Sequence, residues 1–335
     1  MSTAHRAHTM ISHGFWKAQG LMVAAELGIA DHLADGPATV SLLAEKCACD
    51  AGALYRLLRA LASDGFFEET ESGAFRNTDD SEVLRSDHPQ SVRALGMMVR
   101  RLEYPTWVHL LDSIKTGKTA FNEIHGKGLF DYLAEHPEEA DIFDQAMTAV
   151  HGQESPAIAS AYDFSATTSL MDVGGGNGTM LKVILETHPH LQGILFDLPH
   201  VVERARPTLT ASPVGQRVAY QPGSFFDPIP GSPDAMIMRQ IIHDWTDEPS
   251  IQILRNCREA VAPEGKVLVV EQVVPDGNTP HPVKWLDVDM LVYVNGQERT
   301  EQEYRQLFEK AGLALERIIS AGRFEILEGK PAADG

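Results

Sequence analysis

The stretch RQIIHDWTDE, residues 239–248, places a histidine and an aspartate directly after an apolar run. The run AMIMRQII, residues 235–242, is typical of a buried strand, so we expect His243 and Asp244 at its carboxyl end. Strand ends at that edge of an open α/β sheet point into a ligand crevice. An imidazole placed there can take a proton from an acidic hydroxyl, such as that of a phenol or catechol.

Two carboxylates further along the chain can support this imidazole. Glu271 closes the apolar run KVLVVE, and Glu298 lies in the segment GQERT. A carboxylate on one ring nitrogen fixes the tautomer, so that the other nitrogen stays a proton acceptor. Taken alone, His243 could instead be a core or capping histidine, and Asp244 could cap the helix that follows.

The segment LMDVGGGNGTMLKVILETHP contains a glycine-rich turn between a strand and a helix. Its spacing over residues 174–178 is G-x-G-x-G, whereas a dinucleotide fold has G-x-G-x-x-G. Asp172 precedes the turn and favours an amine over a pyrophosphate. Asp197 closes the next strand, where a carboxylate can accept both hydroxyls of a ribose. S-adenosylmethionine fits such a site; the alternative is an ordinary strand-to-helix turn with a surface aspartate.

Length and composition restrict the class of protein. The 335 residues suffice for two domains, and 43% hydrophobic with 22% charged residues is typical of a well-cored globular protein. No apolar run approaches the ~18 residues of a membrane span, and the amino-terminal residues have no apolar signal core. We therefore expect a cytoplasmic protein without membrane contact. The formal charge of -19 argues against nucleic acid as the main partner.

The three cysteines are Cys47, Cys49 and Cys257. This odd, low number argues against a disulfide framework. The first two form C-x-C without the spaced partners of a zinc site, so we interpret them as packing residues.

The first 100 residues have the outline of a winged helix. Apolar residues on helical spacing are followed by two short helices within residues 38–69, with Asp50 a candidate N-cap, and then by a hairpin around a Glu-Ser-Gly turn. Residues 38–69 carry three Lys or Arg against five Asp or Glu, so a basic DNA-reading face is missing. The pattern favours a structural or dimerisation module.

Helical spacing continues from about residue 93 to 161, and alternating strands and helices begin at Ser169. Two apolar stripes in the helical region are interpreted as core packing or, alternatively, as the lining of an apolar ligand site; they are Trp107, Leu110, Leu111 and Ile114, and Phe143, Met147 and Val150. The later alternation predicts a doubly wound α/β sheet covered on both faces. The tail predicts a closing hairpin around Ala321-Gly322.

Several stretches together resemble the small-molecule O-methyltransferases of the caffeic acid and hydroxyindole type and their bacterial natural-product branch. The resemblance covers nearly the whole chain, and its landmarks are LGIADHL, LYRLLRALAS, GLFDYLAEHPE, DVGGGNG, FDLP, GSFFDPIP, IIHDWTDE, GKVLVVEQVV and GQERTEQEYRQLFEKAGL. It implies a class I methyltransferase domain with a Rossmann-like sheet over residues 163–335. It also implies a mostly helical winged-helix-like dimerisation domain over 1–100 and a helical linker over 101–162 that contributes to the acceptor pocket.

The resemblance further implies a cofactor, partners and site residues. S-adenosylmethionine is the expected methyl donor, S-adenosylhomocysteine the product, and no metal takes part. A homodimer is expected, in which the apolar arm GFWKAQGLMVAAELG packs against the partner. The resemblance makes His243 the general base, oriented by Glu271 and Glu298. It predicts cofactor contacts from Asp172, Gly174, Gly175, Gly176, Asp197, Leu198, Ser224, Phe225 and Arg239, and acceptor contacts from Trp107, Met147, Asp244, Met290 and Tyr293.

The chain departs from the family pattern at two of these positions. Ser224 stands where the family usually has an aspartate near the adenine, so that contact is weaker or comes from stacking on Phe225. Arg239 stands where the family usually has lysine, which keeps the charge but not the shape.

Several functions stay open from the sequence. O-methylation of a phenolic or other aromatic hydroxyl in secondary metabolism, such as antibiotic biosynthesis, is the main hypothesis. A C- or N-methyltransferase of the same fold is the first alternative, and a relative that keeps the cofactor for hydroxylation or a pericyclic step is the second. A winged-helix regulator is opposed by the acidic charge, and a nicotinamide oxidoreductase by the glycine spacing and Asp172. The identity of the acceptor is not encoded in any motif.

Overall fold

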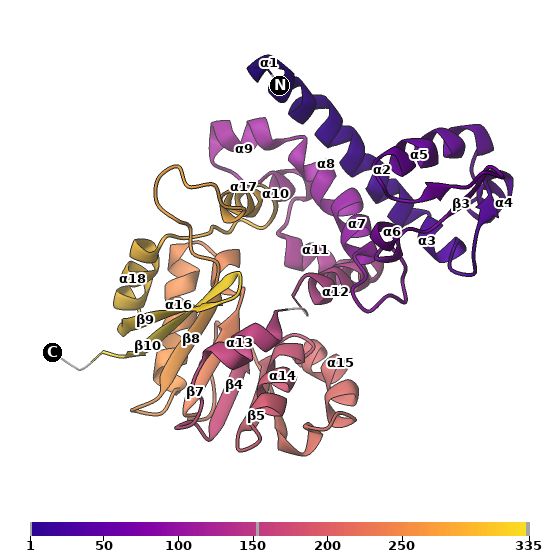
Figure 1. Cartoon of the computed structure of the whole chain (residues 1–335). Coiled ribbons are helices and arrows are strands. Elements are labelled where there is room, and N and C mark those ends of the chain that lie inside the picture. Colours follow the sequence, from indigo (N-terminus) through magenta and orange to yellow (C-terminus); the bar gives the residue numbers. More distant parts are fainter. Residues whose placement is uncertain (1, 152–153, 333–335) are drawn as a thin grey trace. The chain divides into compact units, whose positions relative to one another are not determined.

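The chain divides into two units, Met1–Val108 with Phe130–Gln153 and His109–Leu129 with Glu154–Gly335. The computed structural model describes residues 2–151 and 154–332 (Figure 1). The first unit is mostly helical, and the second contains the large sheet.

The first unit combines helices with a small three-stranded sheet of order β1-β3-β2. Its elements are α1 (Thr3–His8), the π-helical turn η1 (Thr9–Gly14), α2 (Phe15–Glu26), α3 (Ile29–His32), β1 (Ala38–Thr39), α4 (Val40–Lys46), α5 (Ala51–Ser63), β2 (Glu68–Glu69), β3 (Ala74–Arg76), α6 (Asp79–Glu82), α7 (Arg93–Met98), η2 (Val99–Glu103), α8 (Tyr104–Trp107), α11 (Leu129–Glu135) and α12 (Pro137–His151). The Asp50 side chain accepts a hydrogen bond from the Ala53 amide and caps α5. β2 and β3 form the expected antiparallel hairpin, so the winged-helix-like outline is confirmed.

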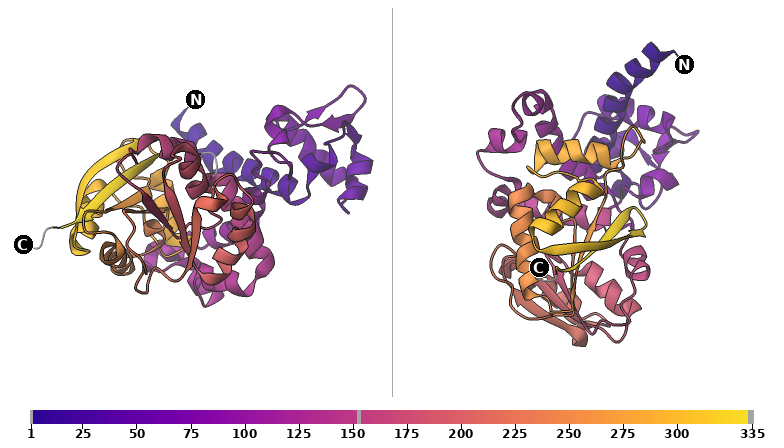
Figure 2. Two further views of the ribbon diagram at one scale, coloured as in Figure 1. Left: turned by 90° about the horizontal axis from the view of Figure 1, so that it is seen from below. Right: turned by 90° about the vertical axis from the view of Figure 1, so that its left-hand side faces the viewer.

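The second unit is built on a seven-stranded sheet of order β6-β5-β4-β7-β8-β10-β9. Five strands run parallel, β4 (Ser169–Val173), β5 (Gln192–Asp197), β6 (Val218–Pro222), β7 (Ala235–Arg239) and β8 (Lys266–Glu271). β9 (Leu313–Ala321) and β10 (Phe324–Pro331) form the antiparallel pair at one edge, drawn in yellow in Figure 2. The predicted doubly wound sheet with its closing hairpin is confirmed.

Helices cover both faces of this sheet because successive strand residues point to opposite sides. In β7, Ala235 and Ile237 join the core under α13 (Ser155–Ala161), α14 (Thr179–Thr187) and α15 (Pro199–Thr210). Met236 and Met238 join the opposite core, under α16 (Asp247–Ala260) and α18 (Glu301–Lys310). The remaining elements of this unit are α9 (Leu110–Thr116), α10 (Ala120–His125), η3 (Gly215–Arg217), η4 (Ile242–Asp244) and α17 (Val283–Tyr293). α10 and α17 pack against each other.

One local expectation is wrong, and one alternative reading is contradicted. The strand expected over residues 235–242 ends at Arg239, and Ile242–Asp244 form the short 3₁₀ turn η4. Gln240 has a φ of 50°, which breaks the extended backbone before the apolar run is finished. Asp244 does not cap the following helix, because Thr246 occupies the N-cap position of α16.

The apolar stripe that begins at Trp107 does not lie on one helix. α8 ends at Trp107, and α9 begins at Leu110. Leu111 and Ile114 are exposed, so they do not pack in the core of the chain.

The cysteines behave as the sequence predicts. All three are free thiols, and Cys257 is buried in the core under α16. Cys47 and Cys49 are half-buried against the core of the first unit. Over residues 2–151 and 154–332, the structure contains no helix both long and apolar enough to cross a membrane.

Candidate active site

The carboxyl ends of adjacent strands bring four predicted site residues to one edge of the sheet. Asp172 lies in β4, Asp197 ends β5, Arg239 ends β7 and Glu271 ends β8. Because β5, β4, β7 and β8 are neighbours and parallel, these side chains follow one another along the same edge. This edge is where ligands bind in open α/β sheets.

The glycine turn after β4 is a tight backbone structure. Gly174 has a φ of 67°, and its amide donates to the Phe196 carbonyl at 2.8 Å. A Cβ on Gly175 would lie 2.8 Å from the Asp172 carboxylate, which is closer than a side chain tolerates. Glycine at both positions lets the backbone pass directly beside the carboxylate.

Asp172 is a buried acid without a well-formed hydrogen bond. It is 1% exposed, and neither carboxylate oxygen has a partner among the residues that the structure describes. Burial raises the pKa of Asp172 to about 7, although the Arg239 guanidinium acts in the opposite direction. Unpaired buried carboxylates are costly. A cationic amine at this point would satisfy Asp172, so the residues present fit the amino-acid end of S-adenosylmethionine.

Asp197 is held in place by the backbone around it. Its two carboxylate oxygens accept hydrogen bonds from the amides of Gly176 at 2.9 Å and Leu198 at 2.7 Å. The carboxylate is therefore oriented before any ligand arrives. A carboxylate oxygen accepts more than one hydrogen bond, so capacity remains for ribose hydroxyls.

An aromatic cluster lies near the glycine turn. The Phe225 and Phe226 ring centroids are 4.9 Å apart, and Phe226 meets Trp245 edge-on at 4.7 Å. A Cβ on Gly174 would lie 3.6 Å from the Phe225 ring. The Ser224 hydroxyl accepts a hydrogen bond from the Phe226 amide. Trp245, two positions after the histidine, was not among the site residues predicted from the sequence, although its ring belongs to this cluster.

The backbone turn that carries the histidine is held by Glu271. One oxygen of its fully buried carboxylate accepts hydrogen bonds from the amides of Ile241, Ile242 and His243, at 3.1, 3.0 and 3.3 Å. Because these amides bind a side chain instead of the backbone of a neighbouring strand, β7 does not continue past Arg239. The other oxygen, Oε2, has no hydrogen-bond partner among the described residues.

The imidazole itself pairs with Glu298. His243 Nδ1 lies 2.7 Å from Glu298 Oε1, and Nε2 lies 3.4 Å from Asp244 Oδ1. Both side chains of the first pair are nearly fully buried. The Asp287 carboxylate of α17 accepts a hydrogen bond from the Glu298 amide at 2.9 Å and so fixes the backbone of Glu298.

The carboxylates around His243 shift the pKa of its imidazole. Burial alone would lower the pKa of His243, but the carboxylates of Glu271, Asp244 and Glu298 outweigh it and raise this pKa to about 10. Burial raises the pKa of Glu271 as well. The surrounding carboxylates therefore favour the protonated form of the imidazole.

The same three residues could also be considered for a metal. One nitrogen or oxygen from each of His243, Glu271 and Glu298 lies within 4.8 Å of the others. However, Nδ1 and Glu298 Oε1 are hydrogen-bonded to each other, and Glu271 Oε1 binds the backbone. The expectation that no metal takes part stays a prediction.

The predicted acceptor residues are divided between the two units. Met290 and Tyr293 are buried on α17, and the Tyr293 ring meets Phe121 of α10 edge-on at 5.4 Å. Trp107 and Met147 belong to the first unit, on α8 and α12. Their contact with an acceptor stays a prediction.

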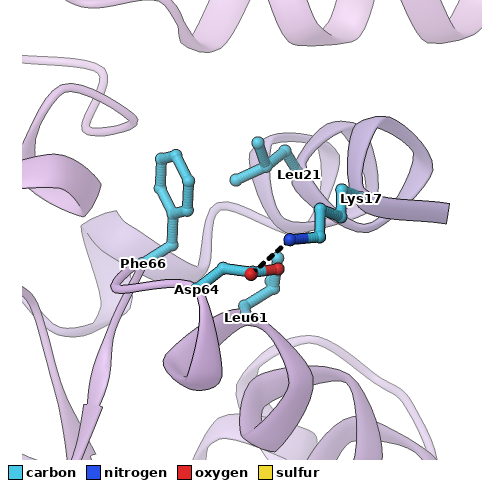
Figure 3. A pocket seen from close by; sticks show the side chains of 5 residues that line it. All are labelled: Lys17, Leu21, Leu61, Asp64 and Phe66. Carbon is cyan, nitrogen blue, oxygen red and sulfur yellow. Dashed lines mark hydrogen bonds and ion pairs between the residues drawn. The ribbon is translucent and has the colours of Figure 1, made fainter. Parts of the chain in front are cut away.

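A small cavity of about 220 Å³ lies in the first unit, remote in sequence from these residues. Figure 3 shows its lining, Lys17, Leu21, Leu61, Asp64 and Phe66, and the ion pair between Lys17 and Asp64. None of the predicted site residues lines it. It is therefore not a candidate for the catalytic centre.

Fold and site together define a class I methyltransferase domain combined with a helical dimerisation domain. Residues 107–314 match the O-methyltransferase domain model, and residues 10–87 match the O-methyltransferase dimerisation domain model. The chain belongs to this O-methyltransferase family, and its methyl donor is S-adenosylmethionine.

Known proteins match along almost the full length. The chain is 43% identical to the phenazine O-methyltransferase PhzM of Lysobacter antibioticus, over 95% of this chain and 94% of that protein. The crystal structure of LaPhzM superposes with a TM-score of 0.95 at 42% identity, covering 99% of this chain and 100% of the other. The O-methyltransferase NcsB1 from neocarzinostatin biosynthesis, in complex with S-adenosylmethionine and 2-hydroxy-5-methyl naphthoic acid, has a TM-score of 0.83 at 33% identity, over 94% and 95% of the two chains.

Proposed function

We propose that this enzyme methylates a hydroxyl of an aromatic small molecule, of phenolic acidity, in the biosynthesis of a natural product, with His243 as the general base. The observation that carries the proposal is the buried pair of His243 and Glu298, which follows the same sheet edge as Asp172 and the glycine turn. The relatives named above support the acceptor class, because they act on a phenazine or bind a hydroxynaphthoic acid.

The proposed contacts of the donor follow the edge of the sheet. S-adenosylmethionine supplies an electrophilic methyl group on a positively charged sulfur. Asp172 would receive its amine and Asp197 its ribose hydroxyls, while Phe225 and Trp245 offer aromatic surface for the adenine. Gly174, Gly175 and Gly176 would keep the backbone close to the ligand. Leu198, Ser224 and Arg239 complete the proposed set.

The proposed role of His243 depends on which nitrogen is occupied. Glu298 holds a proton on Nδ1, so Nε2 is the nitrogen that accepts a proton from the acceptor hydroxyl. A cation bound nearby would lower the pKa of the imidazole and so favour a proton-free Nε2. S-adenosylmethionine, when bound, would supply the methyl group, and Nε2 would take the proton that the acceptor hydroxyl loses as it is methylated.

Glu271 supports the same ring indirectly in this proposal. It fixes the backbone of the turn through three amides. Asp244, Met290 and Tyr293 would contact the acceptor, and Trp107 and Met147 stay predicted acceptor contacts.

The test of the function is a product analysis by mass spectrometry. The purified protein is incubated with S-adenosylmethionine and a panel of phenazinols, naphthols, catechols, anthracyclinones and hydroxyindoles. A gain of one methyl mass together with S-adenosylhomocysteine supports methyl transfer, and NMR of the product distinguishes an O-methyl from a C- or N-methyl group. Bound cofactor with products that never gain a methyl mass would favour the non-methylating alternative.

Glu298→Gln is expected to move the pH profile of kcat to lower pH and to lower its plateau. The Glu298 carboxylate raises the pKa of His243, so a neutral amide lets the imidazole lose its proton at a lower pH. Loss of tautomer control lowers the plateau by roughly 10- to 100-fold. The measurement is kcat between about pH 6 and 10, a range set by the pKa of a histidine shifted upwards.

Glu316→Gln is the matched control, because Glu316 of the edge strand β9 pairs with Lys330 of β10 and both side chains are partly exposed. It should leave the profile unchanged. An unshifted profile in Glu298→Gln would contradict the proposed pairing.

We further propose a homodimer that uses the apolar arm GFWKAQGLMVAAELG together with the exposed hydrophobic residues directly before it. Met10, Ile11 and Trp16 are at least 60% exposed, although they are large hydrophobic side chains. Such an apolar patch marks an interaction surface. Light scattering at micromolar concentration is expected to give twice the chain mass of 36.7 kDa, and Ile11→Asp should shift the protein towards the monomer. A monomeric wild-type protein would contradict this.

A further inference from the structure

Arg299 is a completely buried cation directly next to Glu298. Its guanidinium is 0% exposed. It donates to the carbonyl of Ile242 at 3.1 Å and to the carbonyl of Trp245 at 2.8 Å. Its Nε and Nη2 both donate to Asp247 Oδ1, at 3.2 and 3.0 Å. A buried cation persists only when it is paired and fully hydrogen-bonded, and these acceptors meet that condition.

The residues whose carbonyls accept from Arg299 lie on both sides of His243 in the sequence. Ile242 precedes His243, and Trp245 follows it by two positions. The Ser250 hydroxyl lies 3.3 Å from each of the same two carbonyl oxygens, to which its one hydrogen can be donated, and it also accepts from Arg299. The guanidinium therefore fixes the backbone on both sides of His243 and Asp244.

The segment that carries Arg299 touches the histidine turn at two further places. The Gln297 amide donates to the His243 carbonyl at 2.9 Å. A Cβ on Gly296 would lie 2.0 Å from the same carbonyl oxygen, so only glycine permits this approach. The neighbouring Glu298 holds the ring, as described above.

This segment is itself anchored from outside the turn. The Arg299 carbonyl accepts a hydrogen bond from the Val274 amide at 2.9 Å, after the end of β8. The Asp287 carboxylate holds the Glu298 amide, and Thr300 and Glu303 form a capping box at the start of α18. Because these contacts fix the segment of Arg299, the His243 turn that it binds is fixed as well.

We propose that Arg299 is a positioning residue for methyl transfer, which holds the backbone of the His243 turn so that the imidazole stays in register with Glu298. The proposal rests on the proposed role of His243 as the base. Misplacement of a reacting group by about 1 Å costs around 100-fold in rate. A residue that holds the backbone of the His243 turn, here called the Arg299 clamp, therefore has a large effect on the rate. The planar fork of Arg299 serves several fixed acceptors at once, and a lysine ammonium does not reproduce it.

A purely electrostatic role makes a different prediction. The charged groups that face the imidazole are Glu271 from β8, Asp244 from the turn itself and Glu298. If Arg299 acted only by its charge, its removal would leave these carboxylates uncompensated and raise the pKa of His243. If it positions the turn, its removal loosens the pairing of the ring with Glu298, and this pKa falls towards the ordinary value of about 6.5.

The experiment compares Arg299→Lys and Arg299→Met with the wild-type protein. Arg299→Lys keeps the charge and loses the fork. We expect both variants to lower kcat by roughly 10- to 100-fold with a KM for S-adenosylmethionine within about threefold of wild type. NMR titration of the His243 ring should show a pKa lowered in both. Wild-type kcat and His243 pKa in Arg299→Lys, or a raised pKa in Arg299→Met, would overturn the proposal.

Arg217→Met is the matched control for the loss of an arginine that binds carbonyls. Arg217 donates to the carbonyls of Leu185 and Leu191, beyond the opposite end of the sheet. The Arg217→Met variant removes comparable hydrogen bonds and should change neither kcat nor the His243 pKa. An equal loss in this control would assign the effect of Arg299 to stability alone and overturn the positioning role.

A gentler variant covers the case in which Arg299→Met does not fold. Asp247 is half exposed, and Asp247→Asn weakens the ion pair that orients the guanidinium. It should lower kcat by a few-fold, the range expected when one charged hydrogen bond becomes neutral, and lower the His243 pKa. No change in this variant would count against the clamp.

The titration also separates this proposal from the proposed function. Full turnover in His243→Ala would refute the base. The His243 pKa in Arg299→Lys would still report whether Arg299 positions the ring.

Discussion

His243→Ala is expected to lower kcat by a factor of about 10² to 10⁴, the usual contribution of a general base. The ring is buried, its Nδ1 is bound to Glu298, and Nε2 is the nitrogen left to accept the proton of the acceptor. Alanine removes that acceptor but not the cofactor contacts proposed for Asp172 and Asp197. The KM for S-adenosylmethionine should therefore stay within about threefold of wild type, as expected when only transition-state binding is lost.

The measurement is steady-state kinetics with the acceptor identified by the product analysis. His190→Ala provides a matched control. His190 lies in the loop before β5, donates a hydrogen bond to the Phe164 carbonyl and takes no part in the proposed site. It should keep wild-type kcat. If His243→Ala also kept it, the acceptor would arrive already ionised, and the rate would come from proximity rather than from proton transfer.

Asp172→Asn is expected to weaken the binding of S-adenosylmethionine by about 10- to 100-fold. A hydrogen bond to a charged group contributes about 1.5–3 kcal/mol, and each 1.4 kcal/mol is a factor of ten in Kd. Both carboxylate oxygens are buried and have no hydrogen-bond partner among the described residues, so the cofactor amine would be their main hydrogen-bond donor. The amide keeps the shape and loses the charge.

The same carboxylate predicts a pH dependence of binding. Burial raises the pKa of Asp172 to about 7, so a proton competes with the cofactor amine below that pH. Affinity should fall as the pH is lowered from about 8 to 6 in the wild-type protein, and this fall should vanish in Asp172→Asn. Isothermal titration calorimetry at the two pH values measures both effects.

Asp234→Asn is the control at the opposite end of the sheet, because Asp234 lies directly before β7 and beside the start of β4. Asp234 accepts hydrogen bonds from the amides of Thr168 and Ser169, where β4 begins. This variant should bind the cofactor with wild-type affinity at both pH values. Equal affinity of Asp172→Asn and wild type would show that the amine of the cofactor is held elsewhere.

The sequence by itself determined the features that depend on local patterns. Alternating apolar strands and helices predicted the parallel sheet, and the glycine turn between Asp172 and the following helix marked the cofactor edge. Asp50 was recognised as a cap because its partner amide is three residues away. His243 and Glu271 were selected because each follows an apolar run, and Glu298 because it lies in the polar segment GQERT, while the roles of all three were implied by the family resemblance. Each of these signals lies within a few residues.

Only the tertiary structure decided how these residues divide their roles. The apolar run up to Ile242 predicted a longer strand, but Glu271, about thirty residues later, captures three amides and turns the backbone at Gln240. The Trp107 stripe has the spacing of one helix, yet the chain breaks between α8 and α9 and leaves Leu111 exposed. The spacing of apolar residues predicts neither the early end of β7 nor the break between α8 and α9. Both depend on groups distant in the sequence that bind the backbone.

The buried guanidinium of Arg299 is the clearest case of this division. In the sequence it is one of many charged residues, in a polar segment where an arginine is normally solvated. Its acceptors, Ile242 and Trp245, lie more than fifty residues away. A hydrogen bond requires two groups at a set distance and angle, and folding alone brings such distant groups together. Residue types and local spacing thus identified the chemistry, and long-range hydrogen bonds decided its geometry.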